Sequence, residues 1–442
     1  MLHQSSMTVR EIKSIIALAI PLVIGQLGQM LLGVFDTIMV GKVGVLDLAA
    51  LSFANSLFIV PFVFAIGILT CISIRTSTAR GQKNQGEARS VCRNGFYLSI
   101  IIGTVFFLAA LAAFPFLHSM GQPDDVATRS EGYYLIVMAS LIPCAMSLLL
   151  KNHADALDRP WPAFWIFMGG VALNILLNAA LIFGQWGFPQ MGLEGAAIAT
   201  LVARWVIVVA MMLWFRFDRS LHPWTPTHWL KKPDWSEIRS LNKLGLPAGL
   251  QTLAEVSTFA AAGLIIGAFG AEALASHQIA LQSSGMAFMI PLGISMALTV
   301  RIGEVHGDHT RQRSIVKTGW FLTLLCSFTT AAIFIFSGKL VASLFIDIPE
   351  IITLAASLLI VSGIFQIVDG LQVASTGLLR GLHDTKIPAK MAILSYWAVG
   401  IPAGYCLAHF AGLEAKGMWW GLALGLGIAS ILLSTRLWRK IR

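Results

Sequence analysis

Long apolar runs recur along the whole chain, and they constrain its fold more than any other feature. Only 12% of the residues are charged, against about a quarter in a soluble domain. Roughly 20 apolar residues suffice for one helical crossing of a bilayer, and lipid admits only helices or closed barrels. The runs are too long for barrel strands and do not alternate, so we predict an all-α membrane protein with twelve transmembrane helices. The expected spans are 14–38, 46–72, 94–117, 132–150, 161–184, 192–215, 240–268, 273–300, 316–337, 351–378, 388–410 and 414–435.

Lysine and arginine are distributed unevenly between the loops that alternate along the chain. With these spans, 26 of them fall on the side that carries both termini and 4 on the other side, while Arg204 lies within a span. This count places Arg380 in a loop on the basic side. Because cytoplasmic loops carry the basic excess, we expect both termini in the cytoplasm and the chain in a bacterial inner membrane. The net charge of +9 then reflects topology and not nucleic-acid binding.

The second half of the sequence repeats features of the first half at an offset of 226 residues. The segment 12–21 resembles 238–247, and loop residues recur as well, Gly81 as Gly307 and Asp158 as Asp384. Each half crosses the membrane an even number of times, so both have one orientation and an axis along the membrane normal relates them. We predict an N-lobe at 1–215, a cytoplasmic linker at 216–239 and a C-lobe at 240–442. Duplicated halves of this kind are typical of transporters, which place their site between the halves and work by rocking one half against the other.

Sequence motifs for ATP hydrolysis, metal binding or covalent catalysis are absent. No G-x-x-x-x-G-K-[ST], H-E-x-x-H or G-x-S-x-G occurs, and the five cysteines stand singly. We therefore expect neither an enzyme nor a cofactor, a zinc site or a disulfide framework. An ion gradient is the remaining energy source, and one charge that crosses 100 mV supplies about 2.3 kcal/mol.

One acid, Asp36, lies within the first expected span, where ionisable residues are rare and usually functional. Gly33, Gln29 and Gln26, three, seven and ten positions before it, lie on the same helical face. This polar face cannot be exposed to lipid. Other polar residues on the fifth and sixth spans are candidates to hydrogen-bond the carboxyl. Proton or sodium handling is one interpretation, and a structural polar cluster that joins helices is the other. The residues of this candidate site are Gln26, Gln29, Gly33, Asn174, Asn178 and Thr200.

Two further acids, Glu255 and Asp369, lie within the seventh and tenth spans. Two carboxylates in a low-dielectric interior share a proton or bind a cation, so this pair is a candidate Na⁺ or H⁺ site. The alternative is that each acid pairs separately with a hydroxyl or an amide. We expect neither to have a basic partner in the spans of this half. Their polar neighbours on the same helices are Gln251, Thr258, Gln366 and Thr376.

Two other ionisable groups lie in or near spans. We interpret Arg204 as a structural charge near a helix end, either partnered or extended toward the interface. His277 is expected to satisfy local hydrogen bonds, with a role in proton transfer as the alternative.

Three stretches of sequence resemble the multidrug and toxic compound extrusion (MATE) family, and its NorM branch in particular. The first span, from Ala19 to Gly41, is similar to the family's opening motif. The stretch from Ser276 to Gly303 resembles the NorM eighth span, and that from Gly377 to Pro402 is also NorM-like. The resemblance covers nearly the whole chain.

This resemblance implies a V-shaped pair of lobes and antiport of drugs against cations. It assigns the N-lobe carboxylate to Asp36, surrounded by Asn174, Asn178 and Thr200, and the cation-binding C-lobe carboxylates to Glu255 and Asp369. Sodium-coupled relatives carry a tyrosine where this chain has Phe365, which removes one hydroxyl ligand. The choice between sodium and proton therefore stays open, with sodium favoured because both C-lobe acids are present.

The expected partners are small, mostly cationic molecules and membrane lipid, handled by a monomer. A flippase for a lipid-linked saccharide is the nearest alternative, but it calls for a more cationic cavity than the mainly acidic intramembrane residues indicate. A membrane-embedded enzyme would need a nucleophile, base or metal cluster. A passive channel is disfavoured by the duplicated halves with buried acids.

Overall fold

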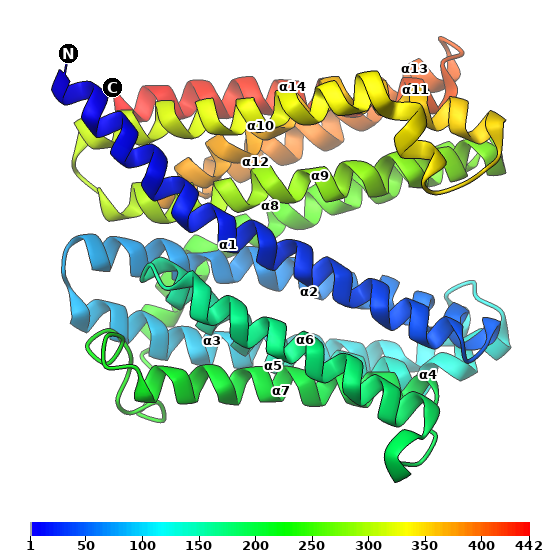
Figure 1. Ribbon diagram of the computed structural model, residues 1–442, viewed down its shortest axis with the longest axis horizontal. Helices are drawn as coiled ribbons and strands as arrows, with labels where there is room; N and C mark the ends of the chain where they lie inside the picture. The colour runs from blue at the N-terminus through cyan, green and yellow to red at the C-terminus, as the bar shows by residue number, and fades with distance from the viewer. Residues whose placement is uncertain (1) are drawn as a thin grey trace. The chain divides into compact units, whose positions relative to one another are not determined.

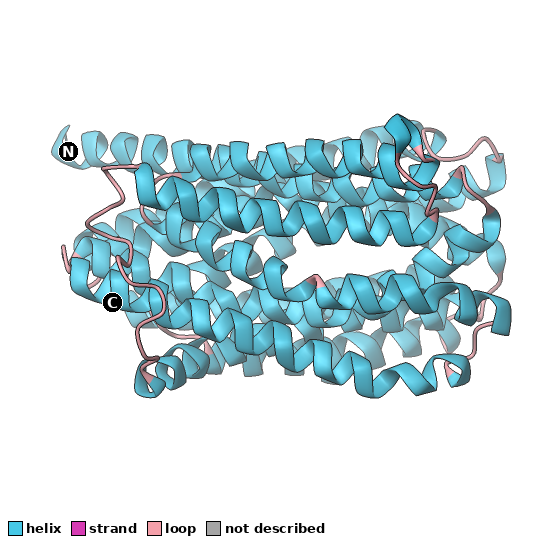
Figure 2. Cartoon of the chain, turned by 90° about the horizontal axis from the view of Figure 1, so that it is seen from below, coloured by secondary structure: helices cyan, strands magenta, loops and turns pink. Residues whose placement is uncertain are grey.

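The computed structural model describes residues 2–442, and the side chains of 1–9, 31 and 32 lie outside the description. Helices joined by short loops make up this part of the chain, and no strand occurs in it (Figure 2). Twelve helical stretches are long and apolar enough to cross a membrane, which confirms the expected number and the all-α class.

The helices follow one another along the chain with short connections (Figure 1). The first seven are α1 (Leu2–Gly41), α2 (Val45–Gly81), α3 (Gln85–Ala113), α4 (Asp124–Ala139), α5 (Leu141–Ala156), α6 (Pro160–Phe183) and α7 (Leu193–Phe217). The others are α8 (Trp235–Gly267), α9 (Ala271–Glu304), α10 (His309–Ser343), α11 (Pro349–Gly381), α12 (Lys386–Leu394), α13 (Ile401–His409) and α14 (Glu414–Ile441). Three short helices, η1 (Phe114–Ser119), η2 (Gln185–Gly187) and η3 (Ser395–Gly400), lie between them.

Most helices extend beyond the spans expected from hydropathy. The second span was expected at 46–72, but α2 continues to Gly81 and carries Arg75 and Arg80 in its polar end. The tenth was expected to end at 378, but α11 continues through Arg380 to Gly381. The expected ends were wrong because hydropathy marks only the apolar part of a helix, whereas its backbone hydrogen bonds continue into polar surroundings.

Two prolines mark the interruptions of otherwise continuous spans. Pro143 lies four residues after Ala139, where α4 ends, and a proline ring clashes with the carbonyl of the residue four positions before it. Pro402 follows η3, a single π-helical turn between α12 and α13. Because π turns widen the helix and frequently occur at functional sites, the residues of η3 become candidates for the site.

The helices group into two compact units, each with its own core. The N-terminal unit comprises Ile24–Gly249, and the C-terminal unit comprises Leu250–Arg442 with Met1–Val23. Both α1 and α8 therefore contribute to both units, a division that differs from the expected lobe boundary at 216–239. The sequence repeat alone cannot indicate this, since it aligns α1 with α8 along their whole lengths.

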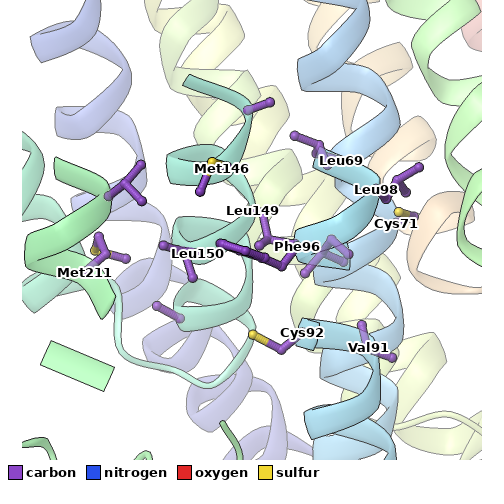
Figure 3. Close-up of a cluster of buried hydrophobic side chains, with 14 of the residues drawn as sticks. Leu69, Cys71, Val91, Cys92, Phe96, Leu98, Met146, Leu149, Leu150 and Met211 are labelled. Carbon is purple, nitrogen blue, oxygen red and sulfur yellow. The ribbon is translucent and has the colours of Figure 1, made fainter. Parts of the chain in front are cut away.

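Apolar side chains from several helices form a large core cluster in the N-terminal unit. Leu69 of α2, Phe96 of α3, Leu149 of α5 and Met211 of α7 belong to one cluster, which Figure 3 shows in close-up. Leu69, Leu149 and Met211 are fully buried. Dispersion and apolar burial hold this bundle together, as in other interiors.

In the C-terminal unit, α11 packs against α9, α10 and α14. A helix surrounded in this way must be apolar or satisfied on all sides, which explains the high burial of α11. The next pair, α13 and α14, approaches closely through glycines: a Cβ atom at Gly421 would overlap the backbone of Gly404. The glycines of α14 thus serve helix packing, as small residues do in membrane proteins.

Candidate ion-coupling sites

Asp36 of α1 lies at one end of a continuous hydrogen-bond chain in the N-terminal unit. The amide of Asn178 donates to Asp36 Oδ1 over 2.6 Å and to Asn174 Oδ1 over 3.1 Å. The amide of Asn174 in turn donates to Thr200 Oγ1 over 3.2 Å. Asn174 and Asn178 are at most 1% exposed, whereas Asp36 is partly exposed. Of the residues predicted for this site, the structure thus brings together Asp36 of α1, Asn174 and Asn178 of α6 and Thr200 of α7.

The direction of these bonds orients the carboxyl of Asp36. Asn178 uses its two N–H groups on Asp36 and Asn174, and its own Oδ1 has no hydrogen-bond partner among the described residues. The hydrogen bond reaches only Oδ1 of Asp36, so in the described part of the chain Oδ2 is available to a proton or a cation. Gln29, two turns earlier on α1, is not brought into this network.

Arg204 is a member of this site that the sequence analysis misplaced. It lies in the middle of α7 and not near a helix end, and it interacts electrostatically with Asp36. Its guanidinium donates to Ser140 Oγ and stands 4.8 Å from the ring centroid of Phe58. The position four residues after Thr200 is the available signal, because residues four apart share a helix face.

Tyr133 of α4 extends the site on another side. Its side chain is 3% exposed, and its hydroxyl donates to Asn55 Oδ1 over 3.3 Å. It interacts electrostatically with both Asp36 and Arg204. Asp36 therefore has a hydrogen bond from Asn178 and the charge of Arg204 near it, so its carboxylate is not an isolated charge in a low-dielectric interior.

Glu255 and Asp369 form the second site, within the C-terminal unit. The two carboxyls are close enough to interact electrostatically. Asp369 is 2% exposed, and its Oδ1 has no hydrogen-bond partner among the described residues. Glu255 is only partly buried. Two interacting carboxyls in a low-dielectric interior either share a proton or bind a cation.

Arg380 corrects the expectation that no basic residue lies near these acids. It belongs to the last turn of α11 and not to a loop, it donates to Gln251 Oε1 over 3.2 Å, and it interacts electrostatically with Glu255. Asp369, Thr376 and Arg380 lie seven and four residues apart, so they share one face of α11. Hydropathy could not reveal the position of Arg380. An arginine at the end of a span is counted with the basic loop residues whether it contacts water or an acid.

Gln251 links the arginine to the rest of this site. Its amide faces Thr376 Oγ1 at 3.5 Å, and Gln372 donates to the same hydroxyl over 3.3 Å. Gln366, by contrast, donates to the carbonyl of Ser284 on α9, so it supports helix packing and does not join the acids. Of the two predicted amides, only Gln251 reaches this cluster.

Tyr396, in the π turn η3, completes the cluster. It is 1% exposed and interacts electrostatically with both Glu255 and Asp369. In the described part of the chain, three buried oxygens here lack a regular hydrogen bond: Asp369 Oδ1, Gln372 Oε1 and Tyr396 Oη. Oxygen donors of this kind suit either a proton or a hard monovalent cation. The sequence signal that was missed is a tyrosine shortly before Pro402.

Phe365 stands one turn before Asp369 on α11 and is 3% exposed. Its ring packs against the rings of Phe259 and Trp419, each with a centroid separation of 6.0 Å. Phe365 therefore supplies an aromatic wall next to the acid pair. His277 accepts a hydrogen bond from the indole of Trp419 on α14 over 3.2 Å, and its Nε2 has no hydrogen-bond partner among the described residues.

The MatE family model matches the chain twice, over residues 21–180 and 247–406. The chain belongs to the MatE family. The two matches are offset by 226 residues, the same offset that the sequence repeat shows. Four of the acids and amides above, Asp36, Asn178, Glu255 and Asp369, lie within the matched ranges.

Relatives of this MATE chain cover almost its whole length. Multidrug resistance protein NorM from Burkholderia vietnamiensis is 33% identical over 95% of the chain and 92% of its own length. The crystal structure of AtDTX14, a eukaryotic MATE transporter, superposes with a TM-score of 0.88 at 21% identity and covers 99% of both chains. The transporter VcmN from Vibrio cholerae superposes with a TM-score of 0.88 at 22% identity, over 99% of this chain and 98% of its own.

These similarities bear out two expectations. The chain is a multi-pass membrane protein of the MATE fold, and multidrug resistance protein NorM is among its relatives. It is a transporter and not an enzyme, as its family is.

Proposed function

We propose that this MATE transporter exports small, mostly cationic molecules in exchange for Na⁺ or H⁺. The observation that carries the proposal is the pair Glu255 and Asp369: the two carboxyls interact electrostatically within a membrane-spanning bundle, and Asp369 Oδ1 has no hydrogen-bond partner among the described residues. Buried acids in spans usually mark ion or proton pathways. The NorM relatives are named multidrug resistance proteins, which supports drugs as the molecules that the ion gradient exports.

The second acid site extends this mechanism to the other half of the chain. Asp36 has a free carboxylate oxygen, so it is suited to take up a cation or a proton from one side and release it on the other. We propose two lobes, 1–215 and 240–442, joined by the linker 216–239, which rock to expose these acids alternately. Binding of an ion then drives release of the exported molecule only if both compete for the same acids.

A flippase for a lipid-linked saccharide fits the charges less well. Such a cargo carries a diphosphate, which calls for unpaired cations in the membrane-spanning region. The two intramembrane arginines, Arg204 and Arg380, each face an acid instead, Asp36 and Glu255 respectively. Neither arginine is therefore left free to bind a diphosphate.

The proposal predicts gradient-driven export from proteoliposomes. The purified full-length chain is reconstituted, and a fluorescent organic cation such as ethidium serves as substrate. An imposed Na⁺ or H⁺ gradient should drive transport of the dye against its own concentration gradient. Each net charge that crosses at 100 mV contributes about 2.3 kcal/mol, which permits roughly 50-fold accumulation of the dye. Collapse of each gradient with its ionophore identifies the coupling ion. Dye transport that is independent of both gradients would contradict antiport, as would transport of a lipid-linked saccharide without any transport of the dye.

A second prediction concerns orientation in the inner membrane. We propose that both termini are cytoplasmic, because 26 of the 31 lysines and arginines lie on their side. Fusions of alkaline phosphatase at the C-terminus should be inactive, whereas a cytoplasmic fluorescent protein there should fold and fluoresce. Active phosphatase at that position would overturn the orientation, and fusion into the loop at 184–192 provides the opposite control.

A further inference from the structure

A cavity opens between α12 and α14, at the end of the C-terminal unit where the chain ends. Its volume is about 410 Å³, in the range of ordinary ligand pockets. Met391 and Leu432 supply its apolar lining, and the rest comes from the last turns of α14: Thr435, Arg436, Arg439 and Lys440. The cavity therefore has an apolar wall and a cationic rim, which together match a molecule with an apolar chain and an anionic head. It is separate from both ion-coupling sites.

The cationic rim is held in place by a buried acid. Asp384, 8% exposed, accepts a hydrogen bond from Arg436 Nε over 2.8 Å and lies 3.4 Å from Lys440 Nζ. Arg439 is exposed and has no partner among the described residues. One carboxylate against three cations leaves an excess of two positive charges at the cavity, so an anion is the matching ligand.

The apolar wall continues onto the surface beside the cavity. Leu394 of α12 is 63% exposed and Ile431 of α14 is 68% exposed, as expected of residues that face lipid chains. At the same end of the bundle, the rings of Trp320 and Trp438 stack with centroids 6.2 Å apart. Tryptophans favour the boundary between lipid and water. The cavity thus lies where a phosphate and an acyl chain occur together.

The end of α14 is fixed from a neighbouring helix. Arg313 of α10 donates to the carbonyls of Ile441 and Arg442 over 2.9 and 2.7 Å. These bonds satisfy carbonyls that a helix end leaves free, and they hold Arg439 and Lys440 in register with the cavity. The rim is therefore a preformed site and not a flexible basic tail.

We propose that this cavity binds an anionic phospholipid, with its phosphate among Arg436, Arg439 and Lys440 and an acyl chain along Met391 and Leu432. Basic pockets between membrane helices on the cytoplasmic side are suited to such headgroups. The bound lipid would complete the packing between α12 and α14. The inference does not depend on which ion drives transport.

Lipid binding is measured on the purified full-length chain in detergent. Native mass spectrometry with phosphatidylglycerol or phosphatidylcholine should show preferential retention of phosphatidylglycerol. Each basic residue near an anionic headgroup contributes roughly a fivefold gain in affinity, so Arg439→Gln should weaken binding about fivefold and Arg439→Gln with Lys440→Gln about 25-fold. Met391→Trp fills the apolar part and should reduce retention without any change in charge.

The matched control is Lys317→Gln, which removes one exposed charge from α10 at the same end without touching the cavity. It should change retention of phosphatidylglycerol less than twofold. An equal loss in Lys317→Gln would mean diffuse surface charge and would overturn the site, as would equal retention of phosphatidylcholine. If inorganic phosphate is retained as strongly as phosphatidylglycerol, the cavity binds a soluble anion instead of a lipid.

Discussion

Asp36→Asn is expected to reduce coupled export to the level of empty vesicles while the protein still folds and inserts. The asparagine has the shape of the acid, and its carbonyl can still accept the hydrogen bond from Asn178. It cannot take up a proton or balance a cation, so the coupling step is lost. The substitution should cost about 1 kcal/mol of stability, because Arg204 loses a partly exposed acid but keeps its hydrogen bond to Ser140 and its contact with the Phe58 ring. Export from proteoliposomes and the thermal midpoint, measured together, separate the two effects.

Two further variants sharpen this test. Asp124→Asn removes an exposed acid from the same unit, whose contact with His118 is a surface ion pair, so export should be unchanged. Asp36→Glu retains the charge and should recover part of the export. Loss of expression or of the folded state in Asp36→Asn would favour the structural polar cluster. Normal coupled export in that variant would exclude Asp36 from ion coupling.

Asp369→Asn and Glu255→Gln are expected to alter the ion dependence of export. The two acids face each other and Tyr396, so neutralising either removes the negative charge that holds a proton or a cation between them. Sodium binding, if export proves sodium-driven, should be weaker at low pH because protons compete for the same carboxylates. Export is therefore measured against sodium concentration at two pH values.

The arginine makes the two substitutions unequal. Glu255→Gln removes the acid that Arg380 interacts with, and Arg380 Nε is already buried without a hydrogen-bond partner among the described residues, so the loss is costly. Asp369 has no such basic partner. We therefore expect Asp369→Asn to change ion dependence with the smaller loss of stability. Glu350→Gln, an exposed acid in the first turn of the same helix, is the matched control and should leave ion dependence intact.

Phe365→Tyr adds a hydroxyl one turn before Asp369 and should strengthen sodium dependence. If neither acid variant changes ion dependence, Glu255 and Asp369 are structural, and coupling depends on Asp36 alone. If Phe365→Tyr lowers the thermal midpoint instead, the contacts with Phe259 and Trp419 leave no room for the hydroxyl.

Much of the N-terminal site was predictable because its members lie at regular spacings on apolar helices. A polar side chain in such a helix must face protein, so Asn174 and Asn178, four residues apart, indicate one buried face. The periodicity does not say which helix that face meets. Gln29 shares the face of Asp36 yet stays outside the network, and Gln366 shares the face of Asp369 yet bonds to α9.

Arg380, Arg204 and Tyr396 show the limit of this reasoning. An arginine at a span end adds to the topology count whether it meets water or an acid, and only the packing of α11 against its neighbours places Arg380 beside Gln251. Tyr396 reaches the acids from a π turn ahead of Pro402, a local widening that no hydrophobic pattern predicts. Arg380 and Gln251, for example, lie 129 positions apart in the sequence.

By itself, the sequence determined the twelve helices, the 226-residue repeat and the class of protein, because the bilayer imposes helix length and polarity on any chain that crosses it. It also indicated which acids are unusual. Only the tertiary structure decided which partners those acids have, where the helices break, and how α1 and α8 are divided between the two units. The physical reason is that lipid restricts every span in the same way, whereas contacts between helices depend on side-chain shape and hydrogen bonds across distant parts of the chain.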